Sequence, residues 1–256
     1  LVVSRNYKKL KISIITINLN NKLGLRKTLK SIKYQTYQNF QHILVDGYSS
    51  DGSRELINEN KNLFNELIFK KATGVYPAIN EGLKKTKGDV ICLLHSGDKF
   101  SDKNVLNYIS EKFSNLKIDV LFSGTRIIKN KKVFRVYRGN SLKKWDLRLG
   151  LSPPHLSTFV KSDVIKKIGL YDTNFKIASD FNFFVKLYKI KNLKFIVSKK
   201  NLVDMEHGGK SNQGIISIYN ITKEIKMVLK KNNIYSNYFF IILRIFFKFK
   251  QMINVK

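Results

Sequence analysis

The sequence has little cysteine, proline or glycine: 1, 3 and 14 residues respectively in a chain of 256. Because the one thiol, Cys92, cannot form an intramolecular disulfide, a disulfide scaffold is excluded and a reducing, cytoplasmic location is favoured. The low proline and glycine content argues against collagen-like and low-complexity classes. The motifs CxxC, HExxH and GxxxxGK[ST] are absent, which argues against zinc-ribbon, zincin and P-loop proteins. The apolar start of the sequence, three residues long, is too short for a signal peptide.

Acidic residues and arginine are scarce too. The chain has 18 acidic and 48 basic residues, a formal net charge of +30, and only eight of the basic residues are arginine. Such a charge suggests a nucleic-acid partner, but arginine, the cation suited to bidentate recognition of phosphates and bases, is the rarer one. We therefore favour a cationic surface close to anionic material, with a nucleic-acid-binding module as the less favoured alternative.

Short apolar runs rich in β-branched residues alternate with helical patterns in the first half of the chain. Strands are predicted at residues 12–17, 42–45, 66–69, 89–94 and 118–122. Helices are predicted at residues 25–33, 53–60, 77–85 and 106–113. This alternation, joined by short loops, predicts an α/β fold with a mainly parallel sheet.

Polar side chains gather where three of the predicted strands end, the edge at which parallel sheets bind ligands. They are Thr16, Asn18 and Asn20, then Asp46 and Asp51, then Asp98. Because the same residue types make good turns, a purely structural role stays open for each loop. Further along, the pattern predicts an edge strand at 133–137, irregular chain at 145–151, a strand at 156–160, and helices at 162–168 and 178–188.

Several sequence blocks resemble the family-2 glycosyltransferases that build bacterial surface polysaccharides of the O-antigen and capsule type. The blocks are Ile14–Asn21, Ile43–Ser53, Gly74–Gly82, Gly88–Asp98, Pro154-His155, Gly169–Asp172 and Ala178–Phe181. The resemblance runs from about residue 11 to residue 212 and implies a GT-A fold. It implies a nucleotide-sugar-binding half at 11–123 and an acceptor half at 124–212, after an N-terminal lead at 1–10. Basic and aromatic C-terminal helices are expected at 213–256.

The resemblance also implies inverting transfer from a nucleotide sugar, expected to be a UDP-sugar, to a glycan carried on a polyprenyl diphosphate. The donor-binding residues that it implies are Thr16, Asn18, Asn20, Asp46, Asn80, Ser96 and Lys210. The role of Asp46 is chemically sound, because a carboxylate can accept the N3–H of uracil. Asp98 would hold Mg²⁺ or Mn²⁺, which prefer oxygen ligands.

The resemblance assigns the remaining roles to one carboxylate and three histidines. Asp180 would act as the general base that deprotonates the acceptor hydroxyl; the alternative is a helix N-cap. His155 would face the acceptor, with a hydrogen-bonded structural histidine as the alternative. For His95, beside the metal site, and for His207, near the diphosphate, ligand and structural roles both stay open.

The sequence departs from the family pattern at the metal site. The usual Asp-x-Asp is replaced by His95-Ser96-Gly97-Asp98, which has one carboxylate instead of two. A catalytically weak or inactive relative that binds glycans or acts as a scaffold at the membrane is therefore an alternative. Departures at Ala72-Thr73 and Pro77 leave the donor sugar unassigned.

The C-terminal segment 238–249 is apolar and aromatic but shorter than the ~20 residues that a membrane span needs. On a helical wheel, its polar stripe consists of Asn237, Arg244, Lys248 and Gln251. With the lysines just before it, this pattern suits a helix lying on an anionic membrane, at the inner face of the plasma membrane. An ordinary helix packed on the domain is the alternative.

Overall fold

The structure, a computed structural model, describes residues 10–207 and 214–253. In this part of the chain a nine-stranded sheet has the order β3-β2-β1-β4-β8-β6-β9-β5, and β7 pairs with β6. The strands are β1 (Ile12–Asn18), β2 (Phe40–Asp46), β3 (Glu66–Phe69), β4 (Val90–Leu93), β5 (Lys99–Phe100), β6 (Val120–Lys129), β7 (Lys132–Tyr137), β8 (Thr158–Lys161) and β9 (Phe195–Glu206). The helices are α1 (Lys22–Lys33), α2 (Ser53–Glu59), α3 (Val75–Leu83), α4 (Val105–Leu116), α5 (Lys144–Arg148), α6 (Ser162–Ile168), α7 (Ser179–Tyr188), α8 (Gly214–Lys231) and α9 (Tyr238–Ile253), with 3-10 turns η1 (Lys61–Leu63) and η2 (His155–Ser157).

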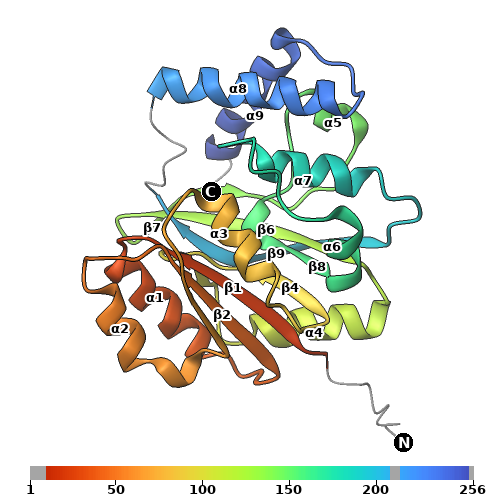
Figure 1. Cartoon of the computed structure of the whole chain (residues 1–256). Helices are drawn as coiled ribbons and strands as arrows, with labels where there is room; N and C mark the ends of the chain where they lie inside the picture. The colour runs from red at the N-terminus through yellow and green to blue at the C-terminus, as the bar shows by residue number, and fades with distance from the viewer. Residues whose placement is uncertain (1–9, 208–213, 254–256) are drawn as a thin grey trace, which may run out of the picture.

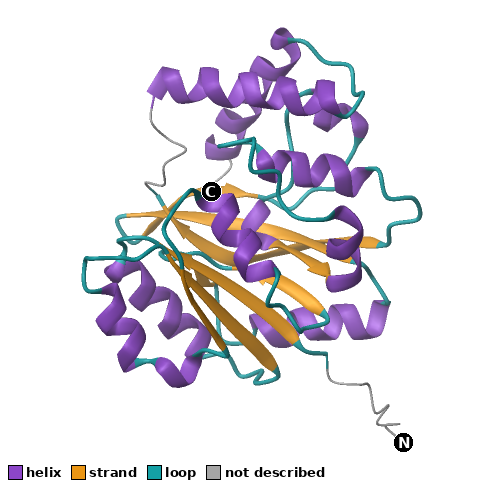
Figure 2. Cartoon of the chain, in the orientation of Figure 1, coloured by secondary structure: helices purple, strands orange, loops and turns teal. Residues whose placement is uncertain are grey.

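The first half of the sheet is parallel, as predicted. β1 lies between β2 and β4 and is parallel to both, and β3 continues the parallel order. The apolar run of β1 is buried almost throughout, which is typical of a central strand covered on both faces. Helices flank the sheet on both sides (Figure 2). The predicted α/β fold is confirmed, and the carboxyl ends of β1, β2 and β4 meet at one edge.

The same sheet continues into the second half of the chain. β8 is antiparallel to both β4 and β6, while β6 is parallel to β9. β6 itself crosses the division expected after residue 123. The two halves are therefore joined by hydrogen-bonded strands.

A second hydrophobic core lies among the helices α5, α7, α8 and α9, which Figure 1 shows above the sheet. Its members are Leu147, Phe175, Ala178, Phe181, Val185, Ile225, Val228, Leu229, Ile234 and Ile241. Residues 145–151, expected to be irregular, contain the short helix α5, whose Leu147 is fully buried in this core. The C-terminal helices predicted for 213–256 are present as α8 and α9, and they pack on α5 and α7 through this core.

Helix α9 turns Arg244, one residue of its predicted polar stripe, inward. Arg244 is only 4% exposed and donates from Nη2 to Thr222 Oγ1 of α8 at 3.1 Å. Phe239 and Phe246, by contrast, are 67% and 65% exposed. The helix thus packs on the domain, while an aromatic face stays uncovered by the described residues. The side chains of Lys248 and Gln251 lie outside the described part.

A buried polar pair links β1 to β2. The His42 imidazole lies 3.0 Å from Thr16 Oγ1 through Nε2 and 3.2 Å from the Leu63 carbonyl oxygen through Nδ1. Since a carbonyl can only accept, Nδ1 carries the proton and Nε2 accepts from Thr16. Burial lowers the pKa of His42 to about 4, so the ring is neutral in the folded protein at neutral pH.

Acidification should therefore destabilise the fold through His42. The unfolded chain takes up this proton below its ordinary pKa of 6.5, whereas the folded protein does so only near 4. The contribution of His42 to the free energy of unfolding is fully present above pH 6.5 and is lost as the pH falls toward 4, by about 2 kcal/mol between pH 7 and pH 5. Urea unfolding at the two pH values should show that the free energy of unfolding falls by about 2 kcal/mol less in His42→Gln than in the wild type. Equal losses in both proteins would contradict this role for His42.

Candidate active site

A cavity of about 470 Å³ opens at the carboxyl ends of β1 and β2. Asn18 and Asp46 are paired in register at these ends, and Asn18 Nδ2 donates to Asp46 Oδ2 at 2.7 Å. Asp46 is 1% exposed and also accepts from the backbone N–H and the hydroxyl of Ser49, each at 2.8 Å. The buried Asn18 Oδ1 has no hydrogen-bond partner among the described residues. The hydrogen-bond acceptor that stays unused among the described residues is thus the Asn18 amide oxygen, and the bond to Asp46 fixes its orientation.

Three other residues predicted to bind the donor do not line this cavity. Thr16 is in the core, bonded to His42 as described above. Asn20 is exposed, and its Oδ1 accepts from Ser50 N at 2.8 Å. Asn80 fixes the backbone of Tyr171, donating to its carbonyl and accepting from its N–H, both at 2.8 Å. These side chains hold the surrounding segments in place.

A second cleft, of about 670 Å³, adjoins the first cavity. The two share four residues: Asn21, Val75, His95 and Ser96. Four further predicted site residues line the cleft: Asp98, His155, Asp180 and His207. The structure thus brings together Asp98 and Asp180, which are far apart in the sequence, next to the cavity behind which Asp46 lies.

Asp98 lies in the turn after β4 and is 6% exposed. Burial, with a smaller contribution from the Glu206 carboxylate, raises the pKa of Asp98 to about 8. Thr28 fixes the turn by donating to the Asp98 carbonyl oxygen at 2.6 Å. The Ser96 hydroxyl nearby is buried and has no hydrogen-bond partner among the described residues. A carboxylate in such surroundings is stabilised in its ionised form by a cation.

Asp180 lies in the first turn of α7, at the wall of the cleft. Its Oδ1 accepts from Phe181 N at 2.7 Å and lies 3.3 Å from the Tyr76 hydroxyl, which also donates to the Ile177 carbonyl at 2.5 Å. The N-cap residue of α7 is Ala178, not Asp180. The N-cap alternative is therefore wrong, and Tyr76 and the helix hold the carboxylate at the cleft.

Glu224 of α8 binds the backbone just ahead of α7. Its Oε2 accepts from Ile177 N at 2.9 Å and from Ala178 N at 2.8 Å, and its Oε1 accepts from Lys176 N at 3.1 Å. The segment that leads into Asp180 is therefore fixed by a single carboxylate. The sequence analysis did not assign Glu224 a role, although it is the only acidic residue after Glu206.

The three histidines differ in their surroundings. Burial, and secondarily His155, lowers the pKa of His95 to about 3, and His95 Nδ1 has no hydrogen-bond partner among the described residues. Burial lowers the pKa of His155 to about 4, and its Nε2 lies 2.7 Å from the Tyr171 hydroxyl. His207 is exposed and packs edge-on against Phe134 at 5.0 Å. The predicted phosphate ligand Lys210 lies outside the described residues.

The family model for glycosyl transferase family 2 matches residues 13–175, more than half of the chain. The chain belongs to this family. An uncharacterized glycosyltransferase of Mycobacterium tuberculosis is 32% identical over 182 residues, which cover 68% of each chain. A PGL/p-HBAD biosynthesis glycosyltransferase of Mycobacterium bovis is 26% identical over 208 residues, which cover 78% of each chain.

Solved structures with the same fold include S. aureus TarS 1-349 in complex with UDP-GlcNAc, which gives a TM-score of 0.65. The sequences are 18% identical, and the match covers 86% of this glycosyltransferase and 66% of that chain. The mannosyltransferase PcManGT from Pyrobaculum calidifontis, in complex with GDP-Man and Mn²⁺, gives a TM-score of 0.64 and 12% identity over 90% and 66% of the two chains. Against a longer S. aureus TarS structure, the match covers 85% of this glycosyltransferase but only 39% of the TarS chain. These likenesses confirm the GT-A fold.

The cleft of this family-2 glycosyltransferase suits a divalent metal held jointly with a diphosphate. No group of three histidine, cysteine or acidic side chains capable of holding a metal occurs within residues 10–207 and 214–253. Asp98 offers one buried carboxylate, and Ser96 an unpaired hydroxyl beside it. Mg²⁺ is commonly held by one or two carboxylates together with substrate phosphates. The donor set therefore fits a metal that arrives with the nucleotide.

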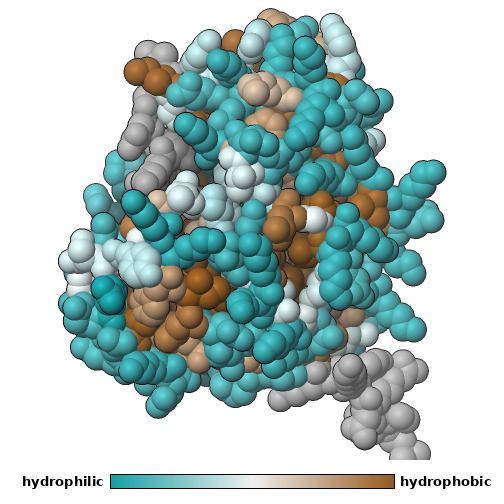
Figure 3. Space-filling view, in the orientation of Figure 1, coloured by the Kyte–Doolittle hydropathy of each residue, from teal (hydrophilic) through white to brown (hydrophobic). Residues whose placement is uncertain are grey.

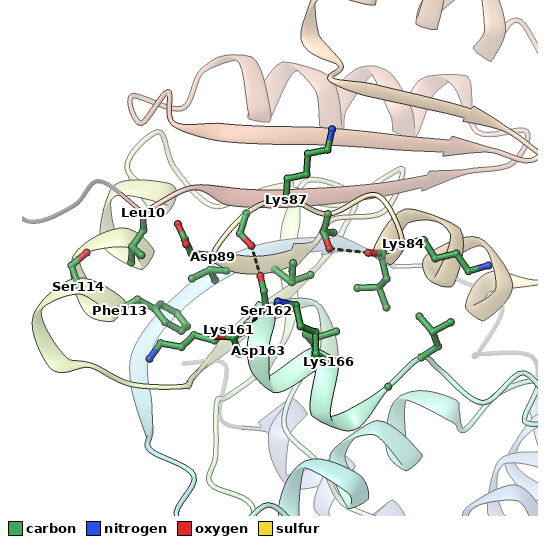
Figure 4. Close-up of a pocket in the computed structure, with 18 of the residues that line it drawn as sticks. Leu10, Lys84, Lys87, Asp89, Phe113, Ser114, Lys161, Ser162, Asp163 and Lys166 are labelled. Carbon is green, nitrogen blue, oxygen red and sulfur yellow. Dashed lines mark hydrogen bonds and ion pairs between the residues drawn. The ribbon is translucent and has the colours of Figure 1, made fainter.

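A larger cavity of the glycosyltransferase, about 1060 Å³, lies elsewhere, near the amino ends of β1 and β4 (Figure 4). Two hydrogen bonds connect the segments that line it: the Ser162 hydroxyl donates to the Gly88 carbonyl, and Asp89 accepts from Lys11 N at 2.8 Å. None of the predicted site residues lines it. Its hydrogen bonds join β4 to neighbouring segments, which is a structural role.

Proposed function

We propose that this protein transfers a sugar from a UDP-sugar to a hydroxyl of a glycan acceptor, with inversion at the anomeric carbon, in surface-polysaccharide biosynthesis. The observation that carries the proposal is the placement of Asp98 and Asp180 in one cleft that adjoins the Asn18 cavity. A GT-A fold binds its donor at this edge, and the cleft beyond it leaves space for an acceptor.

The nucleotide would occupy the cavity at β1 and β2. The unpaired Asn18 Oδ1 can accept the N3–H of uracil, and its orientation is fixed by the bond from Nδ2 to Asp46. The donor diphosphate would extend along Ser96 toward Asp98, because these residues connect the cavity to the cleft. A Mg²⁺ or Mn²⁺ ion held there by Asp98 would supply charge stabilisation to the leaving diphosphate.

Asp180 would act as the general base. Its carboxylate takes the proton of the acceptor hydroxyl while that oxygen forms a bond to the anomeric carbon. The bond from the anomeric carbon to the diphosphate oxygen breaks on the opposite face, and the nucleoside diphosphate leaves with the electron pair. Attack and departure on opposite faces invert the configuration, through a transition state like that of glycoside hydrolysis. Tyr76 and the first turn of α7 keep the carboxylate in position.

The experiment that tests the proposal compares nucleotides as stabilisers in the presence of Mn²⁺. Thermal unfolding should shift upward with UDP and not with GDP, CMP or dTDP at equal concentration, because binding to the folded state alone stabilises it. Transfer from a panel of UDP-sugars to glycan acceptors then identifies the substrates. If no nucleotide raises the unfolding temperature, the donor site proposed here is wrong.

Asp98→Asn should remove the effect of the metal. The neutral amide cannot replace the carboxylate as a charged ligand, so we expect UDP to bind at least tenfold more weakly in Mn²⁺, and equally with and without Mn²⁺. Calorimetric titration of UDP into both proteins measures this. A variant whose UDP affinity still rises with Mn²⁺ would place the metal elsewhere.

The acceptor is proposed to be carried on a polyprenyl diphosphate at an anionic membrane surface. On α9 the exposed side chains include Phe239, Ile242, Phe246 and Phe247, and lysines of α8 precede them in the sequence. Aromatic side chains combined with nearby cations suit the headgroup region. None of the helices in the described part of the chain has the length and apolar character needed to cross a membrane.

Vesicle sedimentation tests this surface. The protein should bind vesicles that contain phosphatidylglycerol, and the double variant Phe239→Ser with Phe246→Ser should bind them at least tenfold more weakly with an unchanged unfolding temperature, because both rings are already exposed. Leu23→Ser, at another exposed apolar position on α1, serves as the control. Equal vesicle binding by the double variant would contradict the membrane role of α9.

The second candidate is a glycan-binding relative with little or no activity. The observation that favours it is the single carboxylate at the turn after β4, where the family usually has two. Such a protein would bind UDP or a glycan but would transfer no sugar from any UDP-sugar with Mn²⁺ or Mg²⁺. Measured turnover excludes it.

A further inference from the structure

Two arginines from distant segments line the cleft, and neither forms an ion pair with a carboxylate of the described residues. Arg135 lies on β7 and Arg244 on α9, and both contribute to the lining of the cleft that holds Asp180. Only 4% of the surface of Arg244 is exposed, and Arg135 is half-buried. The Nε atoms of both are buried without a hydrogen-bond partner among the described residues. No acidic side chain in this part of the chain lies within 4.0 Å of either guanidinium.

Leaving such groups unpaired is costly. Burial lowers the pKa of Arg244 to about 10 and also lowers the pKa of Arg135, which shows that the surroundings oppose the charge. Among the described residues, Arg244 donates to the Thr222 hydroxyl, and the Arg135 guanidinium lies 5.4 Å from the centre of the Tyr137 ring. Buried cations are normally paired or hydrogen-bonded to a partner. An anionic ligand in the cleft would supply that partner.

The pair shares its cleft with Asp180. Tyr137 follows Arg135 on β7, donates to the Ser152 carbonyl at 2.6 Å, and is within electrostatic range of Arg135, Arg244 and Asp180. Neither arginine lines the cavity at Asn18. Both belong to elements that follow the parallel nucleotide-binding strands in the sequence. This position beside the base fits an anion on the acceptor better than one on the donor.

We propose that Arg135 and Arg244 form a subsite for a phosphate oxyanion of the acceptor, close to the hydroxyl that is glycosylated. The assignment to the acceptor rests on the proposed function, whereas the binding of a phosphate oxyanion does not. Guanidinium groups bind phosphate oxygens by two parallel charge-assisted hydrogen bonds, and the Nε–H groups left unpaired here are among the donors used in that geometry. The subsite selects acceptors whose sugar is attached directly to a phosphate.

The test uses inorganic pyrophosphate as the probe and calorimetry on the full chain. With the nucleotide cavity saturated by UDP and Mn²⁺, pyrophosphate should still bind the wild type. Arg135→Gln and Arg244→Gln should each weaken it at least tenfold. Arg138→Gln, an exposed arginine just beyond the end of β7 that does not line the cleft, should leave the affinity unchanged. Unfolding temperatures accompany each titration, and Arg135→Gln carries the test if the more buried Arg244 variant fails to fold.

The outcomes separate the possible sources of the phosphate. If UDP abolishes pyrophosphate binding in the wild type, the arginines serve the donor diphosphate, and the acceptor assignment is overturned. If the wild type does not bind pyrophosphate with or without UDP, or if both arginine variants bind it as the wild type does, the subsite itself is overturned. Titration without nucleotide tests the arginines even if UDP is not the donor. A failure of the proposed function is therefore distinct from a failure of the subsite.

Discussion

Asp180→Asn is expected to lower the turnover number by about 10³-fold, within the range that general-base catalysis contributes. The amide retains the size of the side chain but cannot take the proton of the acceptor hydroxyl. Because Asp180 lines the cleft and not the cavity at Asn18, the affinity for UDP should stay within about twofold of the wild type. Initial rates of sugar transfer and calorimetry with UDP measure the two effects.

The control is Asp163→Asn, which changes an exposed carboxylate on α6 outside this cleft. Its turnover should equal that of the wild type. Normal turnover of the Asp180 variant would remove this residue from the mechanism. A parallel loss of UDP affinity would instead indicate that Asp180 organises the donor site.

Glu224→Ala should reduce both activity and stability, because it removes the acceptor of three backbone N–H groups ahead of α7. We expect the free energy of unfolding to fall by about 2 kcal/mol, the scale of leaving partly buried N–H groups unsatisfied. Turnover should fall by about ten- to one hundredfold, since Asp180 lies directly after the segment that is released. The KM for the donor should change little.

Urea unfolding and steady-state kinetics test this positioning role, with Glu111→Ala on α4 as the matched control. Glu111 is an exposed side chain whose nearest basic nitrogen is 4.0 Å away, so its loss should leave both quantities unchanged. Glu224→Gln should retain part of the stability, because one of its two side-chain oxygens can still accept. If Glu224→Ala loses stability but keeps its turnover, Glu224 stabilises the fold and does not position Asp180.

The sequence predicts the parallel first half of the fold well. β1, β2 and β4 are short runs of mostly buried residues bounded by clear turns, so composition alone locates them. β3, at the end of the sheet, alternates intermediate with exposed residues. β9 is different, because Ser198, Lys199, Lys200 and Asn201 interrupt its apolar residues in a way that is typical of a turn. Pairing with β6, through two shifts of register, keeps this segment extended. Tertiary contacts thus override the local preference.

The site shows a similar division. The family pattern leads to Asp98 and Asp180, and the structure places both in one cleft. The pattern does not reveal that Asp46 already accepts hydrogen bonds from Asn18 and Ser49, or that the Asn18 amide oxygen has no hydrogen-bond partner among the described residues.

Hydrophobic patterning alone does not decide the orientation of α9. The wheel places Arg244 in a polar stripe, and an arginine directed into a cleft gives the same periodicity as one directed into solvent. Figure 3 shows a largely hydrophilic surface on which apolar side chains gather in patches. Which aromatic rings of α9 are exposed follows from the packing of the helix and not from its sequence.

The continuous sheet has a mechanical consequence. β4, which leads into Asp98, is hydrogen-bonded to β8, which leads into α6 and then α7. Two lobes joined by a flexible hinge could draw apart to admit substrates and close for reaction, but strands of one ladder cannot separate without breaking it. The spacing between Asp98, the proposed metal ligand, and Asp180, the proposed base, is therefore established when the chain folds, and we expect substrates to enter by movement of side chains and connecting segments around a rigid frame.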